Sequence, residues 1–195
     1  MEQKITYFEE TRKENTAKTF ELALARGKEL GINTFVVAST SGWTGVEAAK
    51  VFEGQNLIIV SHSYGSREPD KWLFTDENLK VLKDKGVPVV TAAHAFGGIT
   101  RAMNQMKIQG ASTTYVIGDI VANTLRMFGQ GMKVTVEIAC MAADAGLVRC
   151  DTDIISMGGS GRVGGADVAV VLTPANSHRL FETKMREIIC KPREP

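Results

Sequence analysis

The sequence predicts one α/β domain, residues 1–195, with three α/β/α layers around a mixed sheet of about five strands. Short uncharged runs rich in β-branched residues alternate with helical patterns, which is typical of parallel strands joined by helices. A chain of 195 residues that is 44% hydrophobic can bury one substantial core. The fourth and fifth of these runs are joined by a short glycine-rich link, so we expect that pair to be antiparallel.

The expected strands, numbered one to five along the chain, are Thr34–Ala38, Asn56–Ser61, Val87–Ala92, Asp153–Met157 and Asp167–Leu172. The first three carry no charged residue, which fits strands covered on both faces. The helices between them imply right-handed crossovers and therefore parallel pairing. Two further strand-like pieces, Lys4–Phe8 and Glu187–Cys190, lie near the ends of the chain.

Helices are expected where apolar residues recur at helical spacing, at 15–30, 46–52, 75–85, 113–128, 132–147 and near 177–184. In the fifth of these, Val134, Ile138 and Met141 belong to the stripe that faces the core. Its carboxylates, Glu137 and Asp144, are interpreted as surface or buried-network groups rather than as an acid/base pair.

Composition excludes several classes of function. The formal net charge is +1, and no run of lysine or arginine exceeds a pair, so neither nucleic acid nor an anionic membrane is an expected partner. The three cysteines have no CxxC spacing, which fits free thiols, and no metal site is expected. The N-terminus lacks an apolar leader, and no apolar run could cross a bilayer; we expect a soluble cytoplasmic protein.

Hydroxyl side chains gather directly after the first strand: Ser39, Thr40, Ser41 and Thr44 surround Gly42, and a helix follows. A helix start offers unpaired N–H groups and partial positive charge, so anions bind there without needing a lysine. The simpler interpretation is that Ser41 or Thr44 caps the helix, but capping needs only one hydroxyl. Four hydroxyls therefore favour a phosphate site. The turn is neither a Walker A loop nor a GxGxxG motif, because the lysine and the glycine triplet are missing.

The segment Ser39-Thr40-Ser41-Gly42-Trp43-Thr44, followed by a helix and the strand Asn56–Ser61, resembles the hydroxyl-rich turn of the pyruvate kinase C-terminal domain. The likeness extends from about Asn15 to Ile189, and the whole chain is similar to small stand-alone proteins made of this domain alone. The same turn also resembles the flavin mononucleotide (FMN) phosphate loop of flavodoxins. Both resemblances imply a bound phosphate, carried by a sugar bisphosphate in the first family and by FMN in the second.

The pyruvate kinase resemblance also implies a strand order of 3-2-1-4-5 with the fifth strand antiparallel. Strands one and four would then adjoin at the switch point of the sheet, where open α/β sheets bind ligands. The loop Gly159, Ser160 and Gly161 would face the hydroxyl turn there. Pyruvate kinase has a Gly-Ser-Gly in this loop, but its preceding Trp-Arg pair has no counterpart here, and Arg162 is the candidate substitute. The alternative is that this loop is only a flexible hairpin.

Further candidate contacts follow other strand ends. His62, Tyr64 and His94 would lie on the ligand side of the sheet, and no spacing joins the histidines to cysteine or carboxylate as a metal site. Trp43 either shields the start of the helix or offers a flat face to a ring.

The leading hypothesis is binding of a phosphorylated small molecule at the C-terminal ends of strands one and four, with FMN first and a sugar phosphate second. The alternatives are a flavin-dependent oxidoreductase or a phosphotransferase that uses the same site, and a regulatory or assembly module. The last follows from the parent domain, which helps to build pyruvate kinase tetramers, so a homo-oligomer is compatible with the sequence. Pyruvate kinase activity itself is not expected, because that active site lies mainly on a barrel domain for which this chain is too short.

Overall fold

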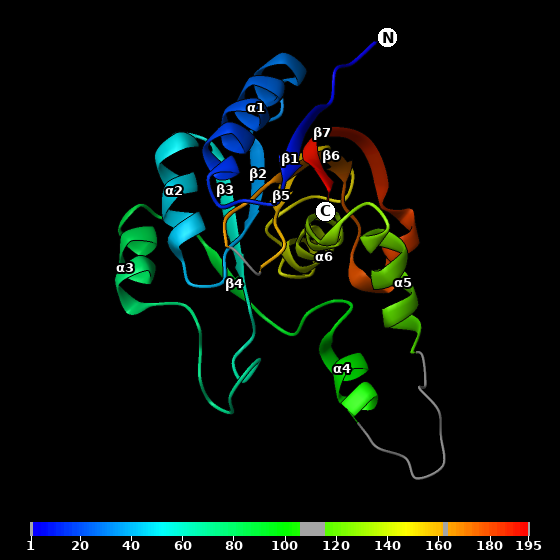
Figure 1. The fold of residues 1–195 in the computed structure, drawn as a ribbon. Coiled ribbons are helices and arrows are strands. Elements are labelled where there is room, and N and C mark those ends of the chain that lie inside the picture. The colour runs from blue at the N-terminus through cyan, green and yellow to red at the C-terminus, as the bar shows by residue number, and fades with distance from the viewer. Residues whose placement is uncertain (1, 106–115, 162–163, 195) are drawn as a thin grey trace.

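The computed structural model describes residues 2–105, 116–161 and 164–194 (Figure 1). Its strands are β1 (Thr6–Glu10), β2 (Thr34–Ala38), β3 (Asn56–Ser61), β4 (Val89–Thr91), β5 (Ile154–Gly158), β6 (Val168–Thr173) and β7 (Lys184–Glu194). Its helices are α1 (Asn15–Leu30), α2 (Trp43–Val51), α3 (Asp76–Asp84), α4 (Gly98–Gln105), α5 (Ile117–Arg126) and α6 (Gln130–Asp144), with a 3-10 helix at Ser177–Glu182.

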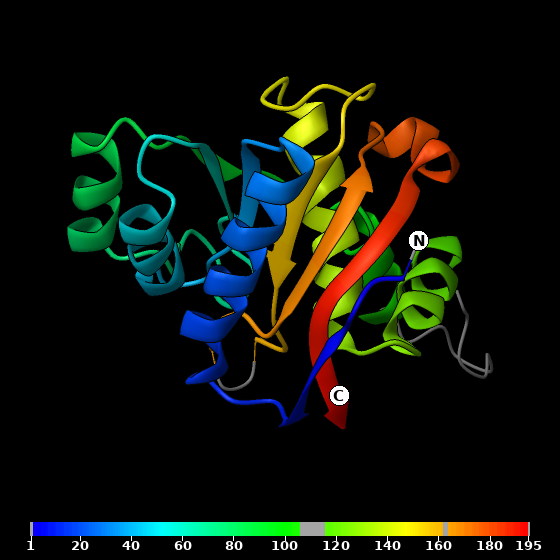
Figure 2. The ribbon, with the colours of Figure 1, turned by 90° about the horizontal axis from the view of Figure 1, so that it is seen from above.

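The strands form one mixed sheet between two helical layers, which confirms the predicted fold class. Figures 1 and 2 show α1 and α2 on one face of the sheet and α6 on the other. Within the described residues the sheet has seven strands in the order β1-β7-β6-β5-β2-β3-β4. The five expected strands are β2 to β6, and their order is the expected one.

The two additional strands come from the ends of the described chain. β7 pairs with β6 in antiparallel orientation, and β1 pairs with β7 in parallel orientation, with Thr6 opposite Cys190. The sequence Lys184–Glu194 is rich in charged residues, so only its central part had the pattern of a buried strand. The sheet is therefore wider than the predicted five strands.

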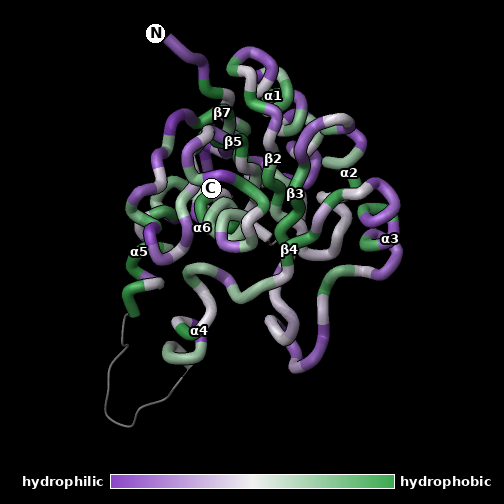
Figure 3. The backbone as a smooth tube through the Cα atoms, turned by 180° about the vertical axis from the view of Figure 1, so that it is seen from behind, coloured by the Kyte–Doolittle hydropathy of each residue, from purple (hydrophilic) through white to green (hydrophobic). Residues whose placement is uncertain are grey.

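The core lies on both faces of the sheet because consecutive residues of a strand point to opposite sides. Phe35 of β2 stacks on Phe52 with ring centroids 4.4 Å apart, and Phe20 of α1 meets Phe52 edge-on at 5.4 Å. The next residue, Val36, packs with Ile138 of α6 in the cluster on the other face. Figure 3 shows hydrophobic residues along the central strands and hydrophilic residues on the outer side of α3.

Several element boundaries differ from the prediction. β4 is shorter than the expected 87–92, because the N–H of Val87 donates to the carbonyl of Leu82 at 2.9 Å and so belongs to the end of α3. α5 corresponds to the helix expected at 113–128, of which residues 113–115 lie outside the described part. α4 was not predicted. None of the helices in the described ranges is long and apolar enough to span a bilayer.

Asp167 precedes β6 and is a buried carboxylate, with 3% of its surface exposed. Burial raises the pKa of Asp167 to about 6, although a hydrogen bond with the side chain of Thr11 acts in the opposite direction. A carboxyl group whose pKa is higher in the folded state binds its proton more tightly there than in the unfolded chain. The charged form present at pH 7.5 therefore costs stability, and this cost falls as the pH drops through 6.

We expect Asp167→Asn to stabilise the protein at pH 7.5 by about 2 kcal/mol, because the amide has no charge to bury. The gain should shrink at pH 5, where the wild-type carboxyl group is largely protonated. Thermal unfolding at the two pH values measures the effect, and the exposed Asp84→Asn is the matched control. A variant less stable than the wild type at pH 7.5 would contradict the expectation.

Candidate functional site

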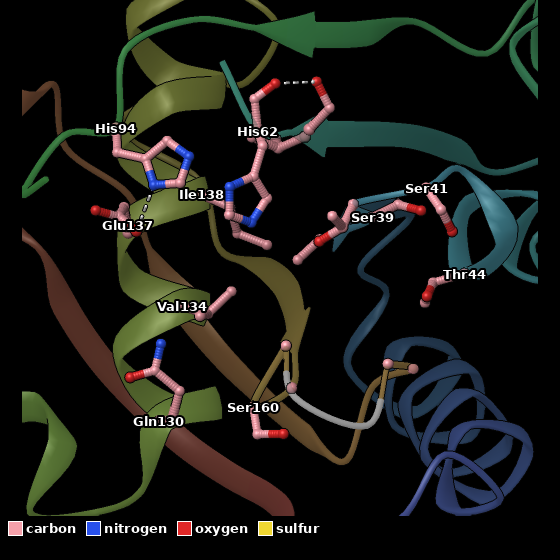
Figure 4. Close-up of a pocket in the computed structure, with 18 of the residues that line it drawn as sticks. Ser39, Ser41, Thr44, His62, His94, Gln130, Val134, Glu137, Ile138 and Ser160 are labelled. Carbon is pink, nitrogen blue, oxygen red and sulfur yellow. Dashed lines mark hydrogen bonds and ion pairs between the residues drawn. The ribbon is translucent and has the colours of Figure 1, made fainter. Parts of the chain in front are cut away.

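A cavity of about 380 Å³ opens at the C-terminal ends of β2, β3 and β5, between the α2 turn and α6 (Figure 4). β2 and β5 pair directly, with Val37 opposite Met157, so the loops that follow them lie side by side. Ten of the predicted site residues line this cavity: Ser39, Thr40, Ser41, Trp43, Thr44, His62, His94, Gly159, Ser160 and Gly161. The switch point expected from the strand order thus holds a pocket.

Two other predicted residues, Gly42 and Tyr64, are not among those that line the cavity. Gly42 supports the turn from behind the cavity wall, as described below. Tyr64 is 60% exposed and stacks on Trp72 with ring centroids 5.2 Å apart, and it is not among the cavity-lining residues. Arg162 lies outside the described residues.

The α2 turn, residues 39–44, is held in place by the start of α3. The carbonyl of Ser41 accepts hydrogen bonds from the Nδ2 of Asn78 at 3.0 Å and from the N–H of Thr75 at 3.1 Å. Gly42 has φ +95°, and a Cβ atom there would lie 2.4 Å from the Cβ of Asn78 and 2.6 Å from the ring of Phe74. Only glycine fits this close approach.

One hydroxyl of the turn is used within the turn itself. The Oγ of Ser39 accepts the N–H of Gly45 at 3.1 Å, so Ser39 rather than Ser41 or Thr44 satisfies a helix-start donor. In the described part of the chain, the N–H groups of Trp43 and Thr44 have no hydrogen-bond partner. Donors of this kind are available to an anion in the pocket.

The pocket gathers positive charge that the sequence analysis did not find. Its described lining includes five basic residues, Lys13, Arg67, Arg101, Arg126 and Lys133, but only one carboxylate, that of Glu137. No described acidic side chain forms an ion pair with the first four of these. Such a concentration of one sign raises the local concentration of anions.

Two of these cations are held by neutral groups. The Nζ of Lys13 lies 3.8 Å from the ring centroid of Trp43, so one face of that ring is already covered. The guanidinium of Arg126 donates to the side chains of Asn123 and Gln130 at 2.7 Å each. Neither arrangement neutralises the charge, which stays available to a ligand.

Glu137 is the centre of a buried polar network, which is one of the two alternatives left open for this carboxylate. It is 3% exposed, its Oε1 accepts the N–H of Phe96 at 3.0 Å, and its Oε2 pairs with Lys133 one helical turn away. The Nδ1 of His94 lies 3.6 Å from the same Oε2. The rings of His94 and His62 are 4.7 Å apart, centroid to centroid (Figure 4).

Burial keeps the two imidazoles in their neutral forms. It lowers the pKa of His62 to about 4, and the charges of His94, Arg101 and Arg67 act in the same direction. Burial also lowers the pKa of His94, and this outweighs the opposite influence of Glu137. Both side chains are therefore neutral at pH 7.

The other reactive side chains of α6 have structural surroundings. Asp144 accepts the N–H of Ser177 at 3.0 Å, away from the pocket. Cys140 is fully buried, and burial raises the pKa of its thiol to about 12, so it is a core residue rather than a nucleophile. Among the described residues, no group of three histidine, cysteine or carboxylate side chains is arranged to hold a metal ion.

A family model described as "Pyruvate kinase, alpha/beta domain" matches residues 17–172. The match runs from α1 to β6 and includes both loops at the switch point, which confirms the resemblance to the pyruvate kinase C-terminal domain. β1 and β7, the strands that the prediction did not count in the sheet, lie outside it.

We expect Gly42→Ala to destabilise the protein by about 3 kcal/mol, because the new methyl group meets Asn78 and Phe74 and the backbone is left-handed. Gly54→Ala is the matched control: Gly54 has φ +78°, and nothing lies within 4 Å of the position that a Cβ atom would take, so only the backbone cost of about 1 kcal/mol applies. Urea unfolding of both variants measures the difference, and equal losses would contradict it.

His62→Gln should change how stability depends on pH. Because the pKa of His62 is lower in the folded state, the unfolded chain binds a proton at this residue more readily than the folded protein does. The stability of the fold is therefore unaffected above about pH 6.5 and decreases as the pH falls from there towards 4. Between pH 7.5 and 5.5 the wild type should lose about 1 kcal/mol through this residue, and the variant should not. Thermal unfolding at both pH values tests this, with His178→Gln, outside the pocket, as control. The same pH dependence in the wild type and in His62→Gln would show the expectation to be wrong.

Proposed function

We propose that this chain, which belongs to the pyruvate kinase alpha/beta domain family, binds a phosphorylated small molecule in the pocket between the α2 turn and α6. The observation that carries the proposal is that a hydroxyl-rich helix start and five basic side chains line one cavity with a single carboxylate. Phosphate oxygens accept hydrogen bonds from the backbone N–H, hydroxyl, guanidinium and ammonium groups present here.

The phosphate end of the pocket is assigned to the α2 turn. Ser41 and Thr44 line the cavity, and Ser39 supports the turn from within. Ser160, on the loop after β5, lines the opposite side of the pocket, and Lys13 adds a positive charge beside Trp43. A phosphate placed here would meet donors from both loops at the switch point.

FMN is the leading candidate ligand. α6 contributes three apolar side chains to the pocket wall, Val134, Ile138 and Met141. An apolar strip of this kind suits a flat ring system, and Trp43 adds an aromatic surface at the phosphate end.

A sugar phosphate is the second candidate, and a different observation favours it. The positive charge in the pocket exceeds what one phosphate requires, and Lys13 covers one face of Trp43. A small, highly polar ligand would make fuller use of these donors than a flat ring.

The double variant Ser41→Ala plus Thr44→Ala should bind FMN or glucose 6-phosphate about tenfold to a hundredfold more weakly than the wild type, because hydrogen bonds to a charged group are lost. Flavin fluorescence follows FMN, and calorimetry follows glucose 6-phosphate. Thermal unfolding checks that the fold is kept. The matched control is Ser177→Ala plus Thr152→Ala, which removes one serine and one threonine hydroxyl outside the pocket.

Higher salt should also weaken binding, because the pocket attracts its ligand through charge. If the double variant bound as tightly as the wild type, the phosphate would not lie at the α2 turn. If neither compound nor inorganic phosphate bound to the wild type, the proposed function would be wrong.

A further inference from the structure

Beyond the α2 turn the pocket continues past His62 to His94, which faces Glu137 (Figure 4). His62 directly follows β3, His94 follows β4, and Glu137 comes from the middle of α6. Three elements far apart in the chain therefore bring these side chains together.

The carboxylate of Glu137 is held in place and faces the ring of His94, with Nδ1 3.6 Å from Oε2. One carboxylate oxygen accepts the Phe96 N–H and the other pairs with Lys133, so the carboxylate cannot turn freely. The Lys133 charge also balances that of Glu137, so no charged imidazole is needed beside it. With Nδ1 of His94 facing the carboxylate, the hydrogen of the neutral ring belongs on Nδ1, which leaves Nε2 as an acceptor.

The two histidines have hydrogen-bonding capacity that the protein does not use. A neutral imidazole has one donor and one acceptor nitrogen. The Nδ1 of His62 is buried and has no hydrogen-bond partner within the described residues. The charged groups facing His62, from the β3 loop, α4 and α6, are Arg67, Arg101 and Glu137. Because the Nδ1 of His62 is closed off from the cavity, the ring nitrogen left for a ligand is Nε2, and both histidines line the cavity beside apolar side chains of α6.

We propose that His62 and His94 form a neutral hydrogen-bonding subsite for the uncharged end of the ligand whose phosphate lies at the α2 turn. This inference rests on the proposed function. The subsite selects a head group that offers an O–H or N–H donor next to an oxygen acceptor. The imide edge of a flavin and the hydroxyl groups of a sugar share this chemistry, and inorganic phosphate lacks such a head group.

Calorimetry with three probes, FMN, glucose 6-phosphate and inorganic phosphate, tests the subsite in the full chain. His62→Ala should bind FMN or glucose 6-phosphate about tenfold more weakly than the wild type, and inorganic phosphate within about twofold of it. His62→Gln keeps a donor and an acceptor without a titratable group, so it should recover most of the lost affinity. His178→Ala, outside the pocket, is the matched control and should change nothing.

The outcomes separate this inference from the proposed function. If His62→Ala binds all three probes like the wild type while Ser41→Ala plus Thr44→Ala loses them, the subsite is wrong and the phosphate site stands. If His62→Ala weakens inorganic phosphate as much as FMN and glucose 6-phosphate, the histidines do not select the head group and the inference is overturned. If the wild type binds none of the probes, the proposed function fails first, and the subsite fails with it.

Discussion

The direct parallel pairing of β2 with β5 is the constraint on which the rest of the site depends. On the β2 side of this pair the sheet continues with β3 and β4, and on the β5 side it continues with β6, β7 and β1. The chain therefore leaves β2 through α2 on one face of the sheet, whereas α6 precedes β5 on the other face. Because α2 and α6 lie on opposite faces, no crossover connection covers the C-terminal ends of β2 and β5, and the pocket lies there. A fold with β2 and β5 apart would separate the α2 turn from the loop at Ser160.

The same geometry sets the electrostatics. Five basic side chains in one pocket repel each other, and the described structure offers them only one carboxylate among the lining residues. Glu137 pairs with Lys133, Lys13 lies over Trp43, and Arg126 donates to Asn123 and Gln130, so three of the cations have specific contacts. Three of the five cations are arginines, whose delocalised charge is more weakly hydrated than an ammonium group and is suited to pairing with phosphate. Such an arrangement works against stability when no anion is bound, which is common at functional sites.

The sequence could predict what depends on neighbours along the chain. The five central strands and the hydroxyl turn each occupy a continuous stretch, so their patterns were visible, and β5 and β6 had to be antiparallel because the link between them is short. The basic side chains could not be found in this way. Lys13, Arg67, Arg101 and Arg126 are widely separated in the sequence, and an overall net charge of +1 conceals their meeting in one pocket. β1 and β7 were recognised only as strand-like pieces, because their pairing with each other and with β6 depends on tertiary contacts between distant parts of the chain.

α6 shows most clearly why a correct pattern can carry two meanings. Its apolar residues at helical spacing, among them Val134 and Ile138, predicted a core-facing stripe, and both do pack in the core cluster. The same side chains, however, also form the apolar wall of the pocket. Lys133 and Glu137 precede these two residues by one position each and lie along the pocket in the same way. Because one helix carries the apolar wall, a cation and the carboxylate that faces His94, a shift of α6 would alter all three together. The packing of α6 on β2 and β5 therefore positions the pocket as directly as it stabilises the fold.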